Sequence, residues 1–317
     1  DDNVFMGSNA GKGSHGNSNS SNVGIGSDCM LAITTGTENV AIGKTSMEDA
    51  NTAAGNVSIG AECLMNLTDG TNNVAIGKVA LNGAGVNPSN SVAVGYASAR
   101  YAEGNNNVAL GQSALRGDSA GNFVGHSNIA IGYESMDALE VGEEYNIAIG
   151  SGAIGAMQEG SGGGDVDHNI GIGLDAFKGG DLAANDRQVQ GNIAIGSYAL
   201  DATSDNAQTG VIAIGHQSLT ALTSGGYNTA IGYKSLEDNQ TGAYNTAVGY
   251  NSLANTTNNY NTAVGYASLI STVGGGGNTA MGHESLYANA TTSNNTGIGY
   301  QTGFYTTGAN NTYVGHS

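Results

Sequence analysis

The sequence has few of the large residues that usually fill a globular core. It contains no Trp, four Phe and one Pro in 317 residues, whereas Gly occurs 53 times. A thick core would be hard to fill with these side chains, and the Ala, Val, Ile and Leu that dominate the apolar residues suit a narrow one. Gly is also abundant in collagen and in disordered chains. Here no Gly-X-Y period occurs and apolar residues recur on a regular schedule, so we expect an ordered chain.

Basic residues are also scarce. Eight Lys and Arg are dispersed among 26 Asp and Glu, and the formal net charge is −18. Nucleic acids and anionic membranes attract positively charged surfaces, so we expect neither as a partner. We expect no direct membrane insertion, because no apolar run approaches the length of a membrane span.

The abundant feature is one repeated motif, N-[V/I/T]-A-[I/V]-G. Most copies are 16–19 residues apart, and Ser91 and Val211 stand where the other copies have Asn. A fixed short period indicates a repeat architecture. The Gly of the eighteen copies lies at 7, 26, 43, 60, 77, 95, 111, 132, 150, 173, 196, 215, 232, 249, 265, 282, 299 and 315.

The period determines the fold that we predict. Repeats built from helix pairs need roughly 33 residues or more, whereas about 17 residues suit one coil of a parallel β-solenoid, or β-roll, with two short strands and two corners. We predict an all-β solenoid of about 18 coils that is continuous over 1–317. It would be a segment of a longer chain or filament. Longer surface loops are expected at 116–127, 157–168 and 178–191.

Each motif position has an expected place. The fourth residue, such as Ile42 or Ile76, is always apolar and is expected inside the coil. The third residue should then face the opposite way by strand alternation, and since it is small it should pack closely against another strand or another chain. This close-packing column includes Ala93, Ala130, Ala148, Ala230, Ala247 and Ala263. The Asn column should form a hydrogen-bonded ladder that includes Asn228, Asn245, Asn261, Asn278 and Asn295.

An aromatic column follows the Gly directly. It contains Tyr96, Tyr133, Tyr233, Tyr250, Tyr266 and Tyr300, and His216, His283 and His316 share it. A position that accepts either ring favours stacking over catalysis. A second Tyr column precedes the Asn, and an exposed aromatic stripe could bind sugars. We favour a stabilising ladder for both columns.

Sites for chemistry are few. Cys29 and Cys63 lie two coils apart, or about 9–10 Å at the spacing of strands. A disulfide needs Cα atoms within about 7 Å, so we expect small interior residues and no disulfide. Asp165 and Asp167 lie in a stretch that resembles the calcium-binding repeat G-G-x-G-x-D. We favour a solvated acidic loop there over a Ca²⁺ site and expect no other cofactor or metal.

We find no Ser/His/Asp set, H-E-x-x-H motif, phosphate loop or paired carboxylates on a recurring face, and we expect no enzyme. Polysaccharide lyases also use parallel β-helices, but they usually combine basic catalytic residues with acidic calcium ligands. The basic residues here are isolated.

The motif resembles the head repeats of YadA-type trimeric autotransporter adhesins. The nearest match is Ser91–Ala99, SVAVGYASA, and Asn245–Leu253, NTAVGYNSL, is also similar to repeats of phage tail fibres. The adhesin resemblance implies a β-roll in which three chains assemble around one axis.

These observations predict a non-enzymatic extracellular fibre, a structural or adhesive rod for attachment at a cell surface. The expected partner is the chain itself, as a homotrimer or end to end, with a surface glycan or host receptor as a further partner. The alternatives are a phage tail-fibre or spike segment that binds a receptor from a virion, and a subunit of a self-stacking extracellular filament.

Overall fold

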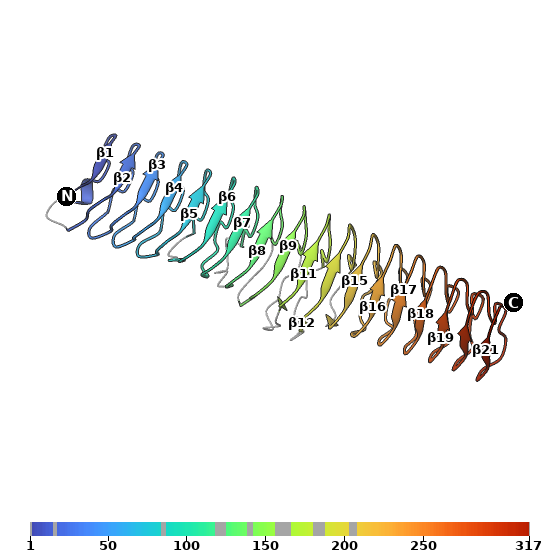
Figure 1. Ribbon diagram of the computed structural model, residues 1–317. Coiled ribbons are helices and arrows are strands. Elements are labelled where there is room, and N and C mark those ends of the chain that lie inside the picture. Colours follow the sequence, from blue (N-terminus) through green and yellow to red (C-terminus); the bar gives the residue numbers. More distant parts are fainter. Residues whose placement is uncertain are drawn as a thin grey trace. The chain divides into compact units, whose positions relative to one another are not determined.

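The computed structural model describes residues 2–14, 18–83, 87–117, 125–137, 142–155, 166–179, 188–202 and 208–316. They form two compact units, Asp1–Gly155 and Ala156–Ser317. Each unit is a parallel β-solenoid (Figure 1), which confirms the predicted fold class. The continuity of one solenoid over 1–317 stays a prediction. The loops predicted at 116–127, 157–168 and 178–191 lie largely outside the described residues.

One strand of three residues per coil builds the main sheet of each unit. In the first unit these are β1 Val4–Met6, β2 Val23–Ile25, β3 Val40–Ile42, β4 Val57–Ile59, β5 Val74–Ile76, β6 Val92–Val94, β7 Val108–Leu110, β8 Ile129–Ile131 and β9 Ile147–Ile149. In the second unit they are β11 Ile170–Ile172, β13 Ile193–Ile195, β15 Ile212–Ile214, β16 Thr229–Ile231, β17 Thr246–Val248, β18 Thr262–Val264, β19 Thr279–Met281, β20 Thr296–Ile298 and β21 Thr312–Val314.

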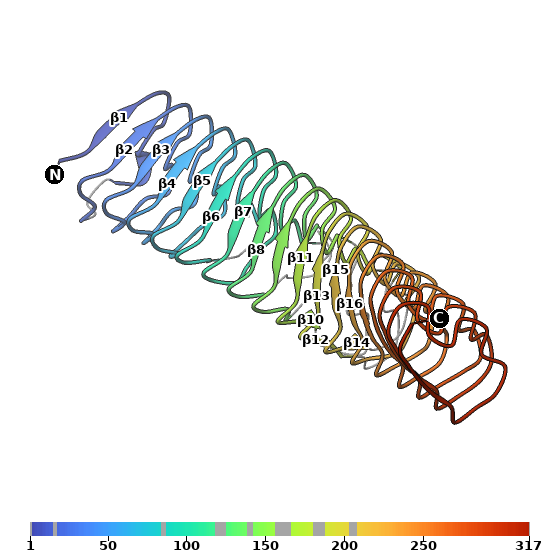
Figure 2. The same cartoon turned by 45° about the vertical axis from the view of Figure 1, so that its right-hand side comes forward.

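The second unit also has a small sheet of three two-residue strands (Figure 2), which are β10 Val166–Asp167, β12 Val189–Gln190 and β14 Gln208–Thr209. A single 3-10 turn, Lys12–Ser14, is the only helical element among the described residues.

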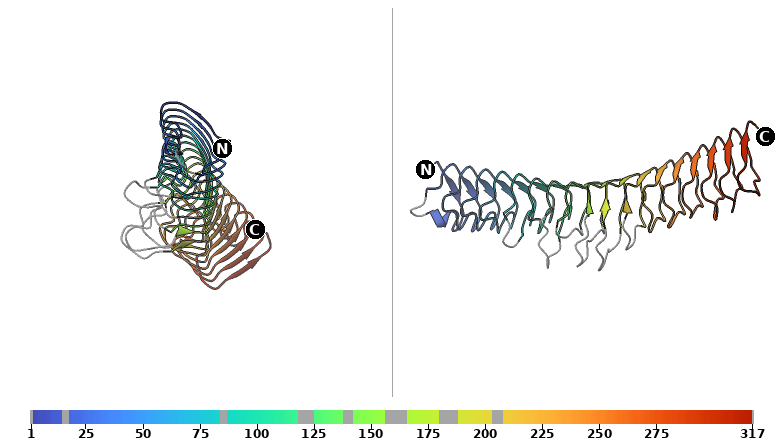
Figure 3. Two further views of the ribbon diagram at one scale, coloured as in Figure 1. Left: turned by 90° about the vertical axis from the view of Figure 1, so that its left-hand side faces the viewer. Right: turned by 90° about the horizontal axis from the view of Figure 1, so that it is seen from below.

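Neighbouring coils pair in register, so equivalent motif positions form columns. Val57 of β4 lies beside Val74 of β5, and Ile59 beside Ile76. Figure 3 shows the strands of each unit collected on one side of its coils. A side chain that points outward in one strand therefore continues a row of similar side chains.

A Gly ends each main strand at a corner that a side chain would block. Gly60 has a φ of 144°, and a Cβ placed on it would lie 2.4 Å from the carbonyl oxygen of Gly77. Gly77 has a φ of 135° and meets Gly95 in the same way, at 2.3 Å. The positive φ and the close carbonyl both require a residue without a Cβ.

After the corner, most described coils do not form the second strand that we expected. Thr45 and Met47 have φ values of 52° and 51°, in the left-handed region. Successive side chains of a strand point to opposite faces, but Ser46 and Met47 are both fully buried. The left-handed turns direct both inward while hydrogen bonds to adjacent coils continue, as from the Met47 N–H to the Cys63 carbonyl at 3.0 Å. The expectation of two strands per coil is therefore wrong for this segment.

The third and fourth motif residues point opposite to our expectation. Ala41 is fully buried and Ile42 is 37% exposed. The interior has no room for a larger third residue, because Leu, Met or Phe side chains from the opposite layer fill it. A Cβ placed on Gly297, at the third position of its coil, would lie 2.8 Å from Cγ of Leu286. The small column thus packs against the opposite layer of its own chain. The Ala residues named above are all fully buried: Ala93, Ala130, Ala148, Ala230, Ala247 and Ala263.

Phe5 and Tyr313 are the two aromatic residues in this small column, and each is matched to glycines. Phe5 lies beside Gly24 in the register, and a Cβ on Gly24 would be 2.7 Å from Cδ1 of the ring. Tyr313 lies beside Gly297, and a Cβ on Gly303 would be 2.7 Å from Cδ2 of its ring. At the third motif position, the two rings therefore lie where glycines leave room for them.

Candidate functional site

The motif Asn lies on the inner side of each coil and links it to its neighbours. Nδ2 of Asn228 donates to the Gly242 carbonyl at 2.7 Å, and its Oδ1 accepts the backbone N–H of Asn245 at 3.0 Å. Oδ1 of Asn245 accepts the N–H of Asn261 at 2.9 Å. The ladder runs mainly from side chain to backbone. The five members named above are fully buried: Asn228, Asn245, Asn261, Asn278 and Asn295.

Two positions interrupt the ladder. At Ser91, the hydroxyl accepts the N–H of Asn107 at 3.2 Å and so replaces part of the missing amide. Val211 is fully buried and its side chain has no acceptor. The N–H of Asn228, next in the column, therefore lacks the partner that the N–H of Asn245 has.

We expect Val211→Asn to stabilise the second unit by about 1 kcal/mol, because it supplies the missing acceptor. The matched change Asn245→Val should destabilise it by about 2–3 kcal/mol, because it leaves the Asn261 N–H and the Asn258 carbonyl without their partner. Urea unfolding followed by circular dichroism measures both. If both changes destabilise the second unit equally, the ladder hydrogen bonds do not account for the stability that the motif Asn contributes.

The outward side of the first unit's sheet is apolar. Ile42, Ile59 and Ile76 are 37–38% exposed, and the Val two residues before each is half-buried. We call the outward residues of β2–β9 the apolar face. Its members are Val23, Ile25, Val40, Ile42, Val57, Ile59, Val74, Ile76, Val92, Val94, Val108, Leu110, Ile129, Ile131, Ile147 and Ile149.

This face lies opposite to the predicted orientation of the strands, although the sequence contains a signal for it. Asn39 and Ala41 lie two residues apart, so strand alternation puts them on one side. A buried Asn ladder therefore buries the Ala and turns Val40 and Ile42 outward. We gave more weight to the size of the Ile side chain than to this alternation.

The outward side of the second unit changes along its sheet. In β11, β13 and β15 both outward residues are Ile. From β16 onward the first becomes Thr, and the second stays apolar. The threonine column consists of Thr229, Thr246, Thr262, Thr279, Thr296 and Thr312.

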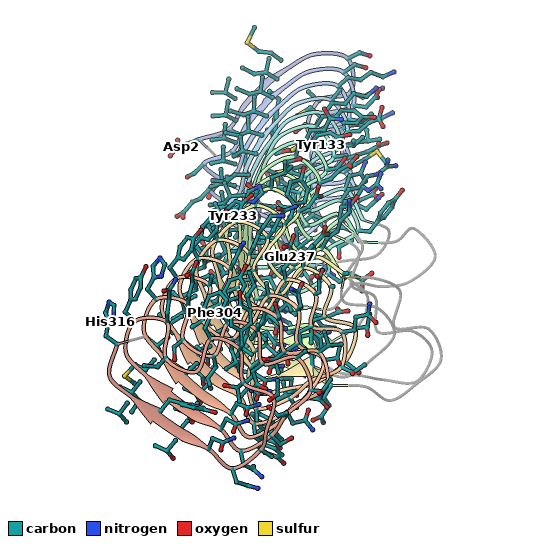
Figure 4. The ribbon with its side chains drawn as sticks, turned by 90° about the vertical axis from the view of Figure 1, so that its right-hand side faces the viewer. Asp2, Tyr133, Tyr233, Glu237, Phe304 and His316 are labelled. Atoms are coloured by element: carbon teal, nitrogen blue, oxygen red, sulfur yellow. The ribbon has the colours of Figure 1, made fainter. Side chains whose placement is uncertain are left out.

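Two aromatic rows border the strands of the second unit. The corner row follows the Gly, and its Tyr233, Tyr250 and Tyr266 rings stack with centroids 5.2 Å apart. Figure 4 shows Tyr233 and His316 along one edge of this unit. The corner row comprises His216, Tyr233, Tyr250, Tyr266, His283, Tyr300 and His316. The entry row comprises Tyr227, Tyr244 and Tyr260, with spacings of 5.2 and 5.3 Å.

The structure thus brings four of the six Tyr residues named for the first aromatic column into one row. Tyr96 and Tyr133 belong to the first unit, where adjacent coils place Lys78, Gln112 and Ser151 at the equivalent position.

The possible sugar-binding stripe was the Tyr column before the Asn, which is the entry row. Its rings also stack, Tyr227 on Tyr244 and Tyr244 on Tyr260, so little ring face is available there for sugar stacking.

The cysteines and the calcium candidates offer little chemistry. Both thiols are free and fully buried, and burial raises the pKa of Cys29 and of Cys63 to about 11. Thiolates are the reactive form, so these groups are unreactive at neutral pH. Asp165 lies outside the described residues, and Asp167 ends β10. Across the described part of the chain, no three His, Cys, Asp or Glu side chains gather as metal ligands would.

Comparison with family models, with curated proteins and with solved structures gives no match. Among the described residues, no helix has the length and apolar character to span a membrane.

Proposed function

We propose that this chain is a non-enzymatic structural module of an extracellular fibre, and that it self-associates through the apolar face. The observation that carries the proposal is the pair of outward apolar columns on β2–β9. Eight strands at 4.7–4.9 Å spacing make a strip roughly 35 Å long. Monomeric proteins rarely leave contiguous apolar patches of more than a few hundred Å² in water.

The chemistry of this strip favours contact with a second copy. It contains only Val, Ile and Leu side chains, so it offers no hydrogen bond or charge to a polar ligand. Identical flat columns on several copies can bury one another around a common axis, as closed symmetric assemblies do. The resemblance to YadA-type head repeats supports three copies. The same resemblance supports a role in surface attachment at a cell surface.

The face with the Val and Ile columns now takes the place that we first gave to the Ala column. The small Ala side chains are already packed inside each coil. The apolar side chains still exposed to water are the outward Val and Ile residues.

The test places two charges on the apolar face. We expect Ile59→Glu/Ile76→Glu to lower the native mass from three times the 31.6 kDa chain mass to that of one chain. The coil should survive, because both side chains already lie partly in water. Sedimentation equilibrium gives the mass, and circular dichroism checks the fold.

The matched control, Thr35→Glu/Thr52→Glu, adds the same charge to exposed positions of neighbouring coils away from the strands. It should leave the native mass unchanged. If both double variants keep the same mass as the unmodified chain, the apolar face is not the interface.

A further inference from the structure

The threonine column carries an ordered array of unused hydroxyl groups. Elsewhere Thr hydroxyls bond within the protein, as Thr223 Oγ1 donates to the Gln240 carbonyl at 3.0 Å and Thr257 Oγ1 to the Val273 carbonyl at 2.9 Å. Among the described residues, no side-chain hydrogen bond joins the hydroxyl of any member of the threonine column. These groups recur once per coil, because the strands pair in register as Thr229, Thr246 and Thr262 do.

Tyr residues add phenol hydroxyl groups beside this column, from the corner row on one side and, at β16–β18, from the entry row on the other. Tyr244 of the entry row precedes Thr246 by two residues, and Tyr250 of the corner row follows Val248 by two. Tyr244 is 50% and Tyr250 46% exposed. Because stacking covers the ring faces, each Tyr presents its ring edge and its phenol hydroxyl to the solvent. Tyr combines an apolar body with a polar tip, which suits a partner with both characters.

This surface has no fixed charge although the chain carries a net charge of −18. From Tyr227 to His316, the entry-row and corner-row positions and the outward strand positions hold no Asp, Glu, Lys or Arg. Lys234 is the one Lys or Arg in 227–316, and its ammonium group is paired with Glu237 at 2.8 Å. A neutral surface on an acidic protein matches a neutral partner, because a cationic partner would be drawn to the acidic residues elsewhere.

We propose that the surface of β16–β21 binds a neutral, extended β-linked polysaccharide that lies along the direction in which the coils stack. Ring centroids in the two rows are 4.8–5.3 Å apart in these coils. The sugar units of an extended β-1,4-linked glycan repeat at nearly the same spacing, so each unit meets one Thr and one apolar side chain. Hydrogen bonds from Thr and Tyr hydroxyls hold the sugar hydroxyls, and the apolar column of Ile, Val and Met side chains contacts the flat sugar ring.

The inference concerns the second unit and stands apart from self-association through the apolar face of the first. It requires β16–β21 to face solvent in the assembly. Within the second unit, the first outward residue is Ile in β11, β13 and β15 and Thr from β16 onward, so the threonine column begins at β16.

The test uses the full chain and two insoluble probes, microcrystalline cellulose and chitin. We expect the unmodified chain to bind at least one of them. Thr246→Val/Thr262→Val/Thr279→Val keeps the shape of the column but removes three hydroxyls, and it should weaken binding at least about tenfold. Tyr244→Phe/Tyr250→Phe should also weaken it several-fold, whereas a site that stacks sugars on ring faces would tolerate Phe.

The control Thr223→Val/Thr257→Val removes hydroxyls outside the column and should bind as the unmodified chain does. Native mass and thermal unfolding are measured for every variant. The proposal is overturned if the unmodified chain binds neither probe, or if the triple variant binds equally well. Thermal hysteresis of ice growth by the unmodified chain without binding to either probe would identify an ice-binding face instead. If the triple variant has a lower native mass than the unmodified chain, the threonine column is a contact between copies and the polysaccharide site is overturned. The apolar face is tested separately, by the Ile59→Glu/Ile76→Glu variant.

Discussion

Gly282→Ala is expected to destabilise the second unit by about 3–5 kcal/mol, a large loss for one methyl group. Gly282 has a φ of 131°, and a Cβ there would lie 2.3 Å from the carbonyl oxygen of Gly299. The Ala must adopt an unfavourable backbone conformation and also push the next coil away. The Gly299 N–H donates to the Met281 carbonyl at 2.8 Å, directly beside this corner. Separation of the coils at the corner therefore weakens the hydrogen bonds between β19 and β20.

Gly315→Ala separates these two effects. Gly315 has a φ of 136° but has no atom within 4 Å of an added Cβ. The Gly315→Ala variant therefore has the backbone strain, about 1–3 kcal/mol, without a clash between the added Cβ and a neighbouring carbonyl. Urea unfolding of the two variants side by side gives the difference. Equal losses would show that backbone conformation alone selects Gly at the corners, and that the close carbonyl is tolerated.

Ala247→Phe is expected to prevent the second unit from forming its coils. Ala247 is fully buried in β17, and its neighbours in the column are Ala230 and Ala263. Leu side chains from the opposite layer already fill the thin interior, so a ring has no space without displacing the sheet. Overpacking of a filled interior commonly costs about 1–3 kcal/mol or more, and here two adjacent coils would be displaced as well. Circular dichroism and the melting temperature report the loss.

The adjacent change Val248→Phe provides the control, because Val248 points outward and is partly exposed. It should change the melting temperature little. The reverse result, with Phe tolerated at 247 and harmful at 248, would restore our first assignment of the two faces and contradict the structure.

The period, the Gly corners and the Asn ladder could be predicted because each follows from a local rule. A spacing of 16–19 residues fits one coil, and Gly60 recurs where the chain turns. The orientation of the strand could not be read from side-chain size, because apolar residues are common on protein surfaces as well as inside. The thickness of the interior decides which side of the strand faces inward. That thickness depends on how far residues such as Leu286 extend from the opposite layer.

The prediction of a second strand in each coil was wrong for a related reason. Ser46 and Met47 are consecutive interior residues, which an extended strand does not allow. The structure resolves this with positive φ at Thr45 and Met47, a conformation that β-branched and long side chains rarely adopt. Local propensity therefore gave no indication of it. The rows of stacked rings, in contrast, follow directly from the period once the strands are in register.

The native mass of the unmodified chain tests the central claim most directly. Sedimentation equilibrium across a range of protein concentrations measures it without assuming a shape. Self-association of three copies through the apolar face predicts three times 31.6 kDa. A mass of 31.6 kDa at every concentration would leave the outward Val and Ile columns uncovered in solution and would contradict the proposal.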